Sequence, residues 1–514
     1  MKSTHTPFQQ RVGASVIENS RGVSEIPSPA AETMSAAGIS FDPPETTQAS
    51  TSNDMASEAR LRLLIPLAVA SALFMDLMDS SALATALPTL CHVFHTNPFV
   101  LKFALTAYLV TIAVLVPASG WLSHRVGMKT TFMLAMAVFM VGSICCGLSN
   151  SVGQLIAARI FQGVGGSMMT PVGRNIIVAS SPRSYLVKAL AWFTLPAILG
   201  PLAGPPLAGA ILEFGNWRWI FFINIPVGLL GLAIVGMFVP RLPRSAIGRF
   251  DWRGFLMLGL SITLAMLLIE TGGLANRPLP MRILVLGAAL LAAALYCRHA
   301  LRHEAVVDIR LLRRDSLTVS LVSSWLQRLS LGAMPYLLPL LLQSAMGLSP
   351  LVASQIMTAM ACGSMAARFV LPPILRRFGF KTAGMILAAM NAIMSASPAL
   401  FHIGTPIALM MILMAATSLI RGLFFILTQT LAYADIEAAE VGHASVLFTV
   451  AQQLSYSMGV AMGAGLLQAS VGDARLTAAA FQIPFIVIAV IGGLSVFAFI
   501  PLRSNAGELA RGAK

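Results

Sequence analysis

The chain has 514 residues, of which 57% are hydrophobic and only 11% are charged. Soluble proteins carry roughly 25% charged residues, and the mean hydropathy here is +0.80. These values exclude a chain of several soluble domains and indicate a protein with many membrane-spanning segments. The five cysteines show no metal-ligand spacing, so we expect no metal site.

The N-terminal segment 1–60 is rich in Ser, Thr, Pro, Glu and Ala and has no apolar periodicity. Such a segment cannot bury enough apolar surface to fold alone, so we expect a disordered cytoplasmic tail. It contains no short apolar core followed by a small-residue cleavage site, which argues against a cleaved signal peptide. A second cytoplasmic tail is predicted at 503–514.

Fourteen apolar segments lie between these tails, each near the length that a helix needs to cross a hydrocarbon layer of about 30 Å. Lipid offers no partner for backbone N–H and C=O groups, so segments of this length must be helices. The sequence therefore predicts an all-α integral membrane protein with fourteen transmembrane helices. Their approximate ranges are 63–90, 99–120, 131–149, 153–178, 187–211, 218–240, 254–272, 282–299, 317–343, 350–374, 382–401, 405–433, 443–470 and 480–502.

The first predicted helix contains two carboxylates, in "FMDLMDSSALATALPTL". Asp76 and Asp79 are three residues apart, on roughly one face of a helix. A carboxylate buried in an apolar span is costly as an anion and can take up a proton there. We therefore expect Asp79, and secondarily Asp76, to carry a coupling proton. The alternative is that both carboxylates face a solvated cavity and only shape its potential.

A basic motif occurs twice, in "GWLSHRVGMKTTFML" from Gly120 and in "PPILRRFGFKTAGMI" from Pro372. Its Arg, Gly and Lys-Thr recur at a constant offset of 252 residues, after the second and the tenth predicted helix. Two six-helix bundles related as parallel repeats, with two extra helices between them, account for this separation. The predicted ranges are 61–240 for the first bundle, 241–315 for the two additional helices and their basic loops, and 316–502 for the second bundle.

The repeated motif predicts a gating role for both loops. The alternative for a single copy is a plain basic connection with a glycine for a tight turn, but the recurrence favours function. The residues concerned are Gly120, His124, Arg125, Gly127, Lys129, Arg377, Gly379 and Lys381.

The fourth predicted helix carries Arg159 in "LIAARIFQGVGG". Beside a carboxylate of the first helix, this fixed positive charge would favour the deprotonated acid in one conformation and release it in another. The alternative is a structural ion pair. The fifth predicted helix holds Gly200, Pro201, Gly204 and Pro205. Glycines four residues apart allow close helix packing, and prolines fix a kink that can act as a pivot. A plain packing face is the alternative.

Three arginines lie within the second bundle, and its predicted helices offer them no acidic partner: Arg328, Arg368 and Arg421. A charge deep in a span cannot easily reach the membrane surface, so we expect these side chains to face an interior substrate cavity. This arrangement favours an anionic, zwitterionic or neutral substrate over a bare cation.

The distribution of Lys and Arg predicts the orientation in the membrane. With the N-terminus inside, twenty-five of the 34 Lys and Arg residues lie on the cytoplasmic side and four lie outside. This bias places both termini in the cytoplasm. It also explains the net charge of +14, so nucleic-acid binding is an unnecessary interpretation.

No phosphate-cradling Gly-x-x-x-x-Gly-Lys-Ser/Thr loop occurs, so transport is expected to draw on the proton gradient, without a bound cofactor, or to run downhill. The stretch "HEAVVD" places His303 and Asp308 at the spacing of some membrane acyltransferases. Nothing else resembles an active site, so we predict no enzyme activity. The residues also leave open a proton-coupled metabolite transporter, working in uptake or export, and a non-transporting membrane sensor.

From residue 61 to 502 the chain resembles the major facilitator superfamily, and within it the fourteen-span drug:proton antiporters of the EmrB/QacA type. "MDSSALATALP" is similar to the first-helix motif of that family, whose acidic residue falls on Asp79. "GWLSHRVGMK" is similar to the loop motif, "RIFQGVGG" to the fourth-helix motif with Arg159, and "GPLAGPP" to the fifth-helix antiporter signature. "GNWRWIFFINIPVG" is similar to the entry of the sixth helix.

The resemblance implies the major facilitator fold and an exporter of drugs or other small molecules in the bacterial inner membrane. Protons would enter as substrate leaves, by alternating access, and a periplasmic adaptor with an outer-membrane channel would be further partners. Three residues depart from the family pattern: His124 replaces an Asp thought to latch the cytoplasmic side, Asp76 is additional to the first-helix motif, and Pro205 replaces a Gly. A histidine there weakens the latch or makes it depend on pH.

Overall fold

The computed structural model describes residues 50–181, 186–240, 249–269, 278–303, 305–432, 436, 441–471 and 476–502. In this part of the chain every regular element is a helix and no strand occurs, which confirms the all-α prediction. The predicted tail at 503–514 and residues 1–49 of the N-terminal tail lie outside the described residues. The prediction for 50–60 is corrected, because the first helix already begins at Ser50. Good helix formers such as Ala, Glu and Arg precede its apolar part.

The first half of the molecule contains the six segments predicted for the first bundle. Two of them are interrupted: a short helix precedes the second, and the sixth begins with another. The elements are α1 (Ser50–Val93), α2 (Pro98–Leu101), α3 (Phe103–Val126), α4 (Met128–Gly147), α5 (Val152–Ser180), α6 (Leu186–Phe214), α7 (Trp219–Phe222) and α8 (Asn224–Phe238).

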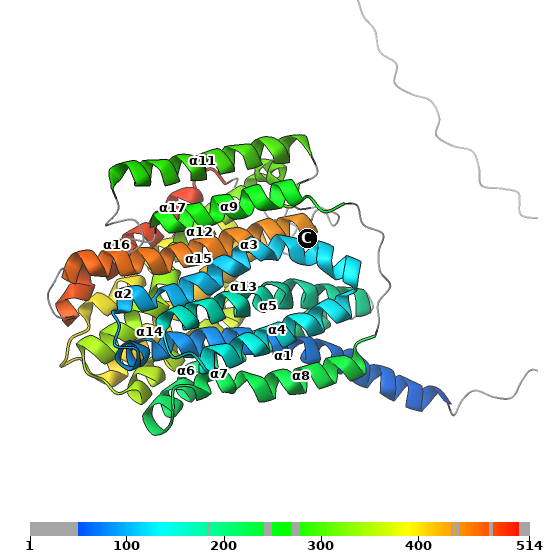
Figure 1. Cartoon of the computed structure of the whole chain (residues 1–514), viewed down its shortest axis with the longest axis horizontal. Coiled ribbons are helices and arrows are strands. Elements are labelled where there is room, and N and C mark those ends of the chain that lie inside the picture. Colours follow the sequence, from blue (N-terminus) through cyan, green and yellow to red (C-terminus); the bar gives the residue numbers. More distant parts are fainter. Residues whose placement is uncertain are drawn as a thin grey trace, which may run out of the picture. The chain divides into compact units, whose positions relative to one another are not determined.

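Two helices, α9 (Trp252–Ile269) and α11 (Leu279–Arg302), follow the first half. They pack against each other, and α9 also contacts α3 and α15 (Val441–Val471). In Figure 1 the pair lies at the edge of the helix assembly, next to α15 and α3. Most side chains of α11 are exposed, as expected of a helix that covers the flank of a membrane bundle.

The second half of the molecule contains the remaining six predicted segments. Helix α13 covers the tenth and the eleventh of them, because the helix assignment continues across a kink at Gly379 (φ 72°, ψ 173°). Besides α15, the elements are η1 (Ile309–Arg313), α12 (Asp315–Pro339), η2 (Leu340–Ala345), α13 (Pro350–Ser395), η3 (Ser397–Leu400), α14 (Ile407–Ala432), η4 (Ala478–Phe481), α16 (Gln482–Gly493) and α17 (Ser495–Ala498).

Ten helical segments of the described residues are long and apolar enough to cross a membrane. Helices α5, α6, α12 and α15 are not among them, and α5, α12 and α15 carry buried polar side chains, for example Gln162, Ser330 and Ser455. Polar residues in these helices face protein and not lipid, which lowers their mean hydropathy without exposing polar groups to the bilayer.

The apolar cores differ between the two sides of the assembly. We call the side that holds Gly127 and Gly379 the motif side, and the side where α1 ends at Val93 and α13 begins at Pro350 the far side. On the far side one core contains residues of both halves. On the motif side each half has large cores of its own, and a small cluster of Ala113, Ile262 and Val450 joins α3, α9 and α15.

Candidate functional site

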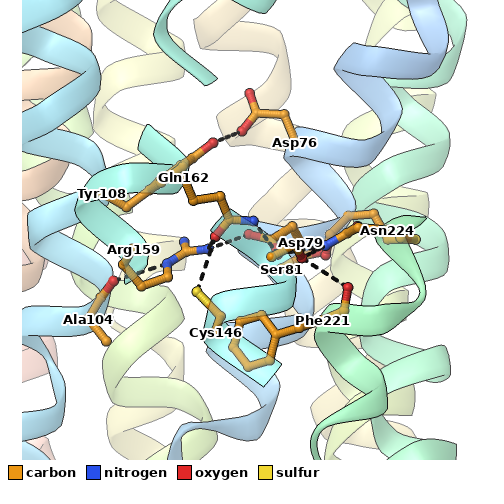
Figure 2. A network of polar contacts seen from close by, with 12 residues as sticks. Asp76, Asp79, Ser81, Ala104, Tyr108, Cys146, Arg159, Gln162, Phe221 and Asn224 are labelled. Atoms are coloured by element: carbon orange, nitrogen blue, oxygen red, sulfur yellow. Dashed lines mark hydrogen bonds and ion pairs between the residues drawn. The ribbon is translucent and has the colours of Figure 1, made fainter. Parts of the chain in front are cut away.

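A buried ion pair lies at the centre of the first half, between α1 and α5 (Figure 2). Arg159 Nη1 is 2.5 Å from Asp79 Oδ2, and each residue is 1% exposed. Arg159 also donates to the carbonyl oxygen of Ala104 (3.2 Å) and to Gln162 Oε1 (2.6 Å). The pair therefore connects three helices: α1, α3 and α5.

The second oxygen of Asp79 is held by two amides. Oδ1 accepts from Asn224 Nδ2 of α8 (2.8 Å) and from Gln162 Nε2 of α5 (3.1 Å). Asn224 also donates to Ser143 Oγ (2.9 Å), which donates to the carbonyl oxygen of Phe221 (2.9 Å). Both oxygens of the buried carboxylate are thus hydrogen-bonded, as an anion in a protein interior requires.

Asp76 belongs to the same network through an aromatic side chain. The hydroxyl of Tyr108 on α3 donates to Asp76 Oδ1, and the guanidinium carbon of Arg159 lies 4.2 Å from the centre of the Tyr108 ring. Tyr108 therefore contacts both Asp76 and Arg159 (Figure 2). The two carboxylates lie in one site, but Asp76 is half-buried and has a different direct partner.

The glycines that follow Arg159 bring Tyr108 to it. A Cβ on Gly166 would lie 2.6 Å from the Tyr108 hydroxyl, and one on Gly163 would lie 2.9 Å from Thr111 Cβ. The stretch "RIFQGVGG" therefore serves both the charge and the close approach of α3 to α5.

A cavity of about 460 Å³ lies beside this network, between the two halves. Its wall combines apolar side chains, one arginine from each half, and a few hydroxyl groups. It is lined by Leu77, Ser80, Ser81, Ala84, Leu105, Tyr108, Leu109, Arg159, Pro201, Pro205, Leu331, Met334, Pro335, Leu338, Met357, Met360, Ala361, Ser364, Ser418, Arg421, Gly422, Phe425, Tyr456 and Val460.

The three arginines predicted for the cavity occupy different places. Arg421 lines it and is 4% exposed. Arg328 is not among the lining residues; its guanidinium carbon lies 4.8 Å from the ring of Phe425, which does line the cavity. Arg368 is exposed and is not among the lining residues either, which corrects the prediction for this side chain. The charge pattern alone did not indicate which face of each helix an arginine occupies.

The glycines of the fifth-helix motif press α6 against α1. A Cβ on Gly200 would lie 2.9 Å from Leu77 Cβ, and one on Gly204 would lie 2.0 Å from Ser81 Oγ and 2.9 Å from the carbonyl oxygen of Met78. These contacts lie on either side of Asp79 along α1. Pro201 and Pro205 line the cavity, and α6 is helical throughout, with no break at the prolines.

The two loop motifs make the same contacts in the two halves. Gly127 and Gly379 both have positive φ (106° and 72°), a conformation that favours glycine. Lys129 Nζ donates to the carbonyl oxygen of Gly236 near the end of α8, and Lys381 Nζ donates to that of Ile500 just after α17, each at 2.8 Å.

Other residues of the motifs have local contacts. Arg125 lies over the ring of Trp121 (5.0 Å) and Arg377 over that of Phe378 (5.5 Å). His124 Nδ1 is buried and has no hydrogen-bond partner among the described residues. A Cβ at Gly120 would meet open space, so close packing does not explain this glycine.

Sequence reasoning did not identify Tyr108, Ser143, Gln162 or Asn224 as parts of the site. Gln162 and Asn224 were detectable as amides within apolar segments, three residues after Arg159 and in "FFINIPVG". Each is completely buried. Which helix faces they occupy depends on packing that a single sequence does not reveal.

The fold and the central cavity between two helical halves are those of a membrane transport protein. A family model described as Major Facilitator Superfamily matches residues 69–460. Two relatives named "Putative multidrug resistance protein MdtD", from Yersinia pestis (strain Pestoides F) and Yersinia pseudotuberculosis serotype O:1b (strain IP 31758), are each 33% identical over 447 residues. The alignments cover 85% of this chain and 96% of each relative.

Solved structures share the fold at low sequence identity. A D-xylose-proton symporter superposes with a TM-score of 0.65 at 16% identity, covering 86% of this chain and 98% of its own. A POT family transporter in complex with 5-aminolevulinic acid gives 0.62 at 15% identity, covering 85% and 94%. The chain belongs to the major facilitator superfamily, as predicted, and is a transporter and not an enzyme.

Proposed function

We propose that the chain is a proton-coupled antiporter that exports drugs or other small molecules across the bacterial inner membrane by alternating access. The observation that carries the proposal is the buried pair of Asp79 and Arg159, of which Arg159 lines the central cavity. The names of the two Yersinia relatives support drug export.

The proposed coupling passes through Arg159. When Asp79 is an anion, it holds the guanidinium group at 2.5 Å. A proton on Asp79 removes most of this attraction, and Arg159, which lines the cavity, is then free to change its partners. Proton and substrate would thus compete through one side chain. Asp76, connected through Tyr108, is the proposed second proton acceptor.

The proposed alternating access uses the asymmetry of the cores. The halves share one core on the far side and have separate large cores on the motif side. Lys and Arg are concentrated toward the motif side, which supports a cytoplasmic assignment for that side and for both termini. In this state the cavity would be closed toward the outside.

The equivalent contacts of Lys129 and Lys381 support two parallel six-helix repeats, with α9 and α11 as the extra pair and fourteen spans in all. His124, whose Nδ1 has no partner in the described part of the chain, would weaken the latch of the first loop. A periplasmic adaptor and an outer-membrane channel stay a prediction, which co-purification from cross-linked cells would test.

The test is substrate-induced proton release from energised inverted vesicles, followed with a pH-sensitive dye. The added compounds are ethidium (a cation), chloramphenicol (neutral) and anthracene carboxylate (an anion). We expect Asp79→Asn to reduce proton release at least about tenfold, while Glu213→Gln, which neutralises an exposed acid, retains it. Undiminished release from well-inserted Asp79→Asn protein would refute the coupling. If the proton gradient instead drove the added compound out of the inverted vesicles, the result would favour an uptake transporter.

A further inference from the structure

The second half contributes an unpaired cation to the cavity wall. Arg421, on α14, is 4% exposed, and its Nε and Nη1 are buried with no hydrogen-bond partner among the described residues. Its Nη2 donates to Ser395 Oγ at 3.0 Å, and that hydroxyl donates to Asn391 Oδ1 at 3.4 Å. The side chains that hold the guanidinium group are therefore neutral and do not compensate its positive charge.

The cavity arginine of the first half provides a direct contrast. Arg159 has Asp79 as a partner, whereas no ion pair of Arg421 is found in the described part of the chain. The lining residues there include no Asp or Glu. Burying a charge without a counter-ion is unfavourable, so an anionic ligand that paired with Arg421 would offset part of that cost.

A second arginine adds positive charge close to this part of the cavity wall. Arg328 of α12 lies over the ring of Phe425, and Phe425 lines the cavity next to Gly422 and Arg421. Tyr456 of α15 lines the same cavity and has a hydroxyl that can donate to an anion. Away from these groups the lining is mainly Leu, Met and Pro.

We propose that Arg421 is the anchor for an anionic group of the transported substrate, a carboxylate joined to an apolar body. The carboxylate would accept a hydrogen bond from Nε or from Nη1, and the apolar body would lie against the Leu and Met side chains of the cavity. Guanidinium and carboxylate match in geometry as well as in charge, because the second N–H of Nη2 can donate a parallel hydrogen bond beside either of them. This inference rests on the proposed function and names the substrate class of the same cavity.

The test measures equilibrium binding, without a proton gradient, to purified protein in lipid nanodiscs. The probes are anthracene carboxylate, its neutral carboxamide, and the trimethylammonium derivative of the same ring system, followed by their fluorescence anisotropy. We expect the carboxylate to bind most tightly. Arg421→Gln should weaken its binding at least about tenfold, Arg421→Lys less, and neither should change binding of the carboxamide. Arg298→Gln, which removes an exposed arginine of α11, is the charge-matched control.

Retained carboxamide binding shows that the Arg421 variants are folded. The inference is overturned if wild-type protein binds carboxylate and carboxamide equally, or if Arg421→Gln weakens both to the same extent. Proton exchange in vesicles, compared between wild type and Asp79→Asn, separates this inference from the proposed antiport. Carboxylate binding that depends on Arg421, with no proton exchange in vesicles, would support the anchor and refute the antiport mechanism.

Discussion

Asp79 accepts hydrogen bonds from Arg159, Gln162 and Asn224, which come from two different helices. Each donor restricts the carboxylate, so the side chain is held in a fixed geometry. Such preorganisation requires that the donors be held in turn, as Ser143 does for Asn224. Asn224 is therefore a supporting residue of the proposed proton site.

Replacing Asn224 by Ala removes one donor from Asp79 and leaves Ser143 without its amide. We expect the unfolding free energy to fall by about 1–3 kcal/mol, the usual cost of an unsatisfied buried polar group, and proton exchange to slow. Thermal unfolding in nanodiscs and the vesicle assay measure the two effects. Asn216→Ala, at an exposed asparagine, is the control. Equal stability of both variants would show that Asn224 does not support the carboxylate.

The sequence indicated the buried carboxylate and the buried guanidinium group but not the residues that surround them. Asp79 and Arg159 stand out because charges are rare in apolar segments. Gln162 and Asn224 are common residues whose role depends on helix rotation. The same limit explains the arginines: Arg421 lines the cavity and Arg368 does not, although each lies well inside a predicted span.

At the scale of elements, α6 is packed against the segment of α1 that carries Asp79. Gly204 lies against Met78 and Ser81, and Gly209, one to two turns further, lies against Ser354 of α13. Helix α6 thus contacts both the segment of α1 that carries Asp79 and the opposite half. A change in either contact is transmitted along α6 if the helix moves as a rigid element.

Gly204→Ala should separate α6 from α1. The new Cβ would lie 2.0 Å from Ser81 Oγ and 2.9 Å from the carbonyl oxygen of Met78, so the helix must shift even if the hydroxyl rotates away. We expect exchange at least about tenfold slower and a loss of about 1–3 kcal/mol in stability. Combining it with Ser81→Ala should recover only part of the loss, because the carbonyl contact remains.

The matched control is Gly287→Ala on α11, where a Cβ meets open space. There we expect unchanged exchange and a gain of up to about 1 kcal/mol in helix stability. If Gly204→Ala behaves like Gly287→Ala in both assays, close packing of α6 on α1 is not required for transport.

At the scale of the whole molecule, the predicted order of helices agrees with the structure, since every predicted segment overlaps a helix. Apolar length determines this result, because a bilayer permits little else. The sequence did not predict on which side of the assembly the two halves share a core. That choice depends on a small free-energy difference between arrangements of the same helices.

Because the two halves share a core on the far side, a covalent link across that contact should hold the transporter in this arrangement. A Cβ on Gly209 would lie 2.7 Å from Ser354 Cβ, so a disulfide between Gly209→Cys and Ser354→Cys needs only a shift of about 1 Å. In a background with all five native cysteines replaced by Ser, we expect oxidation to stop exchange and a reductant to restore it. Each single cysteine variant is a control. Full activity of the oxidised pair would show that this contact does not open during transport.

Helix α9 contacts α3 of one half and α15 of the other, with α11 outside it. On this flank the pair straddles the seam between the halves, so lipid tails and solutes dissolved among them meet a double layer of helices. An oily compound that reaches the protein sideways, out of the membrane leaflet, would meet no such second layer along the other seam, where α6 packs against α13. The extra helices thus make the two seams between the halves unequal toward the lipid.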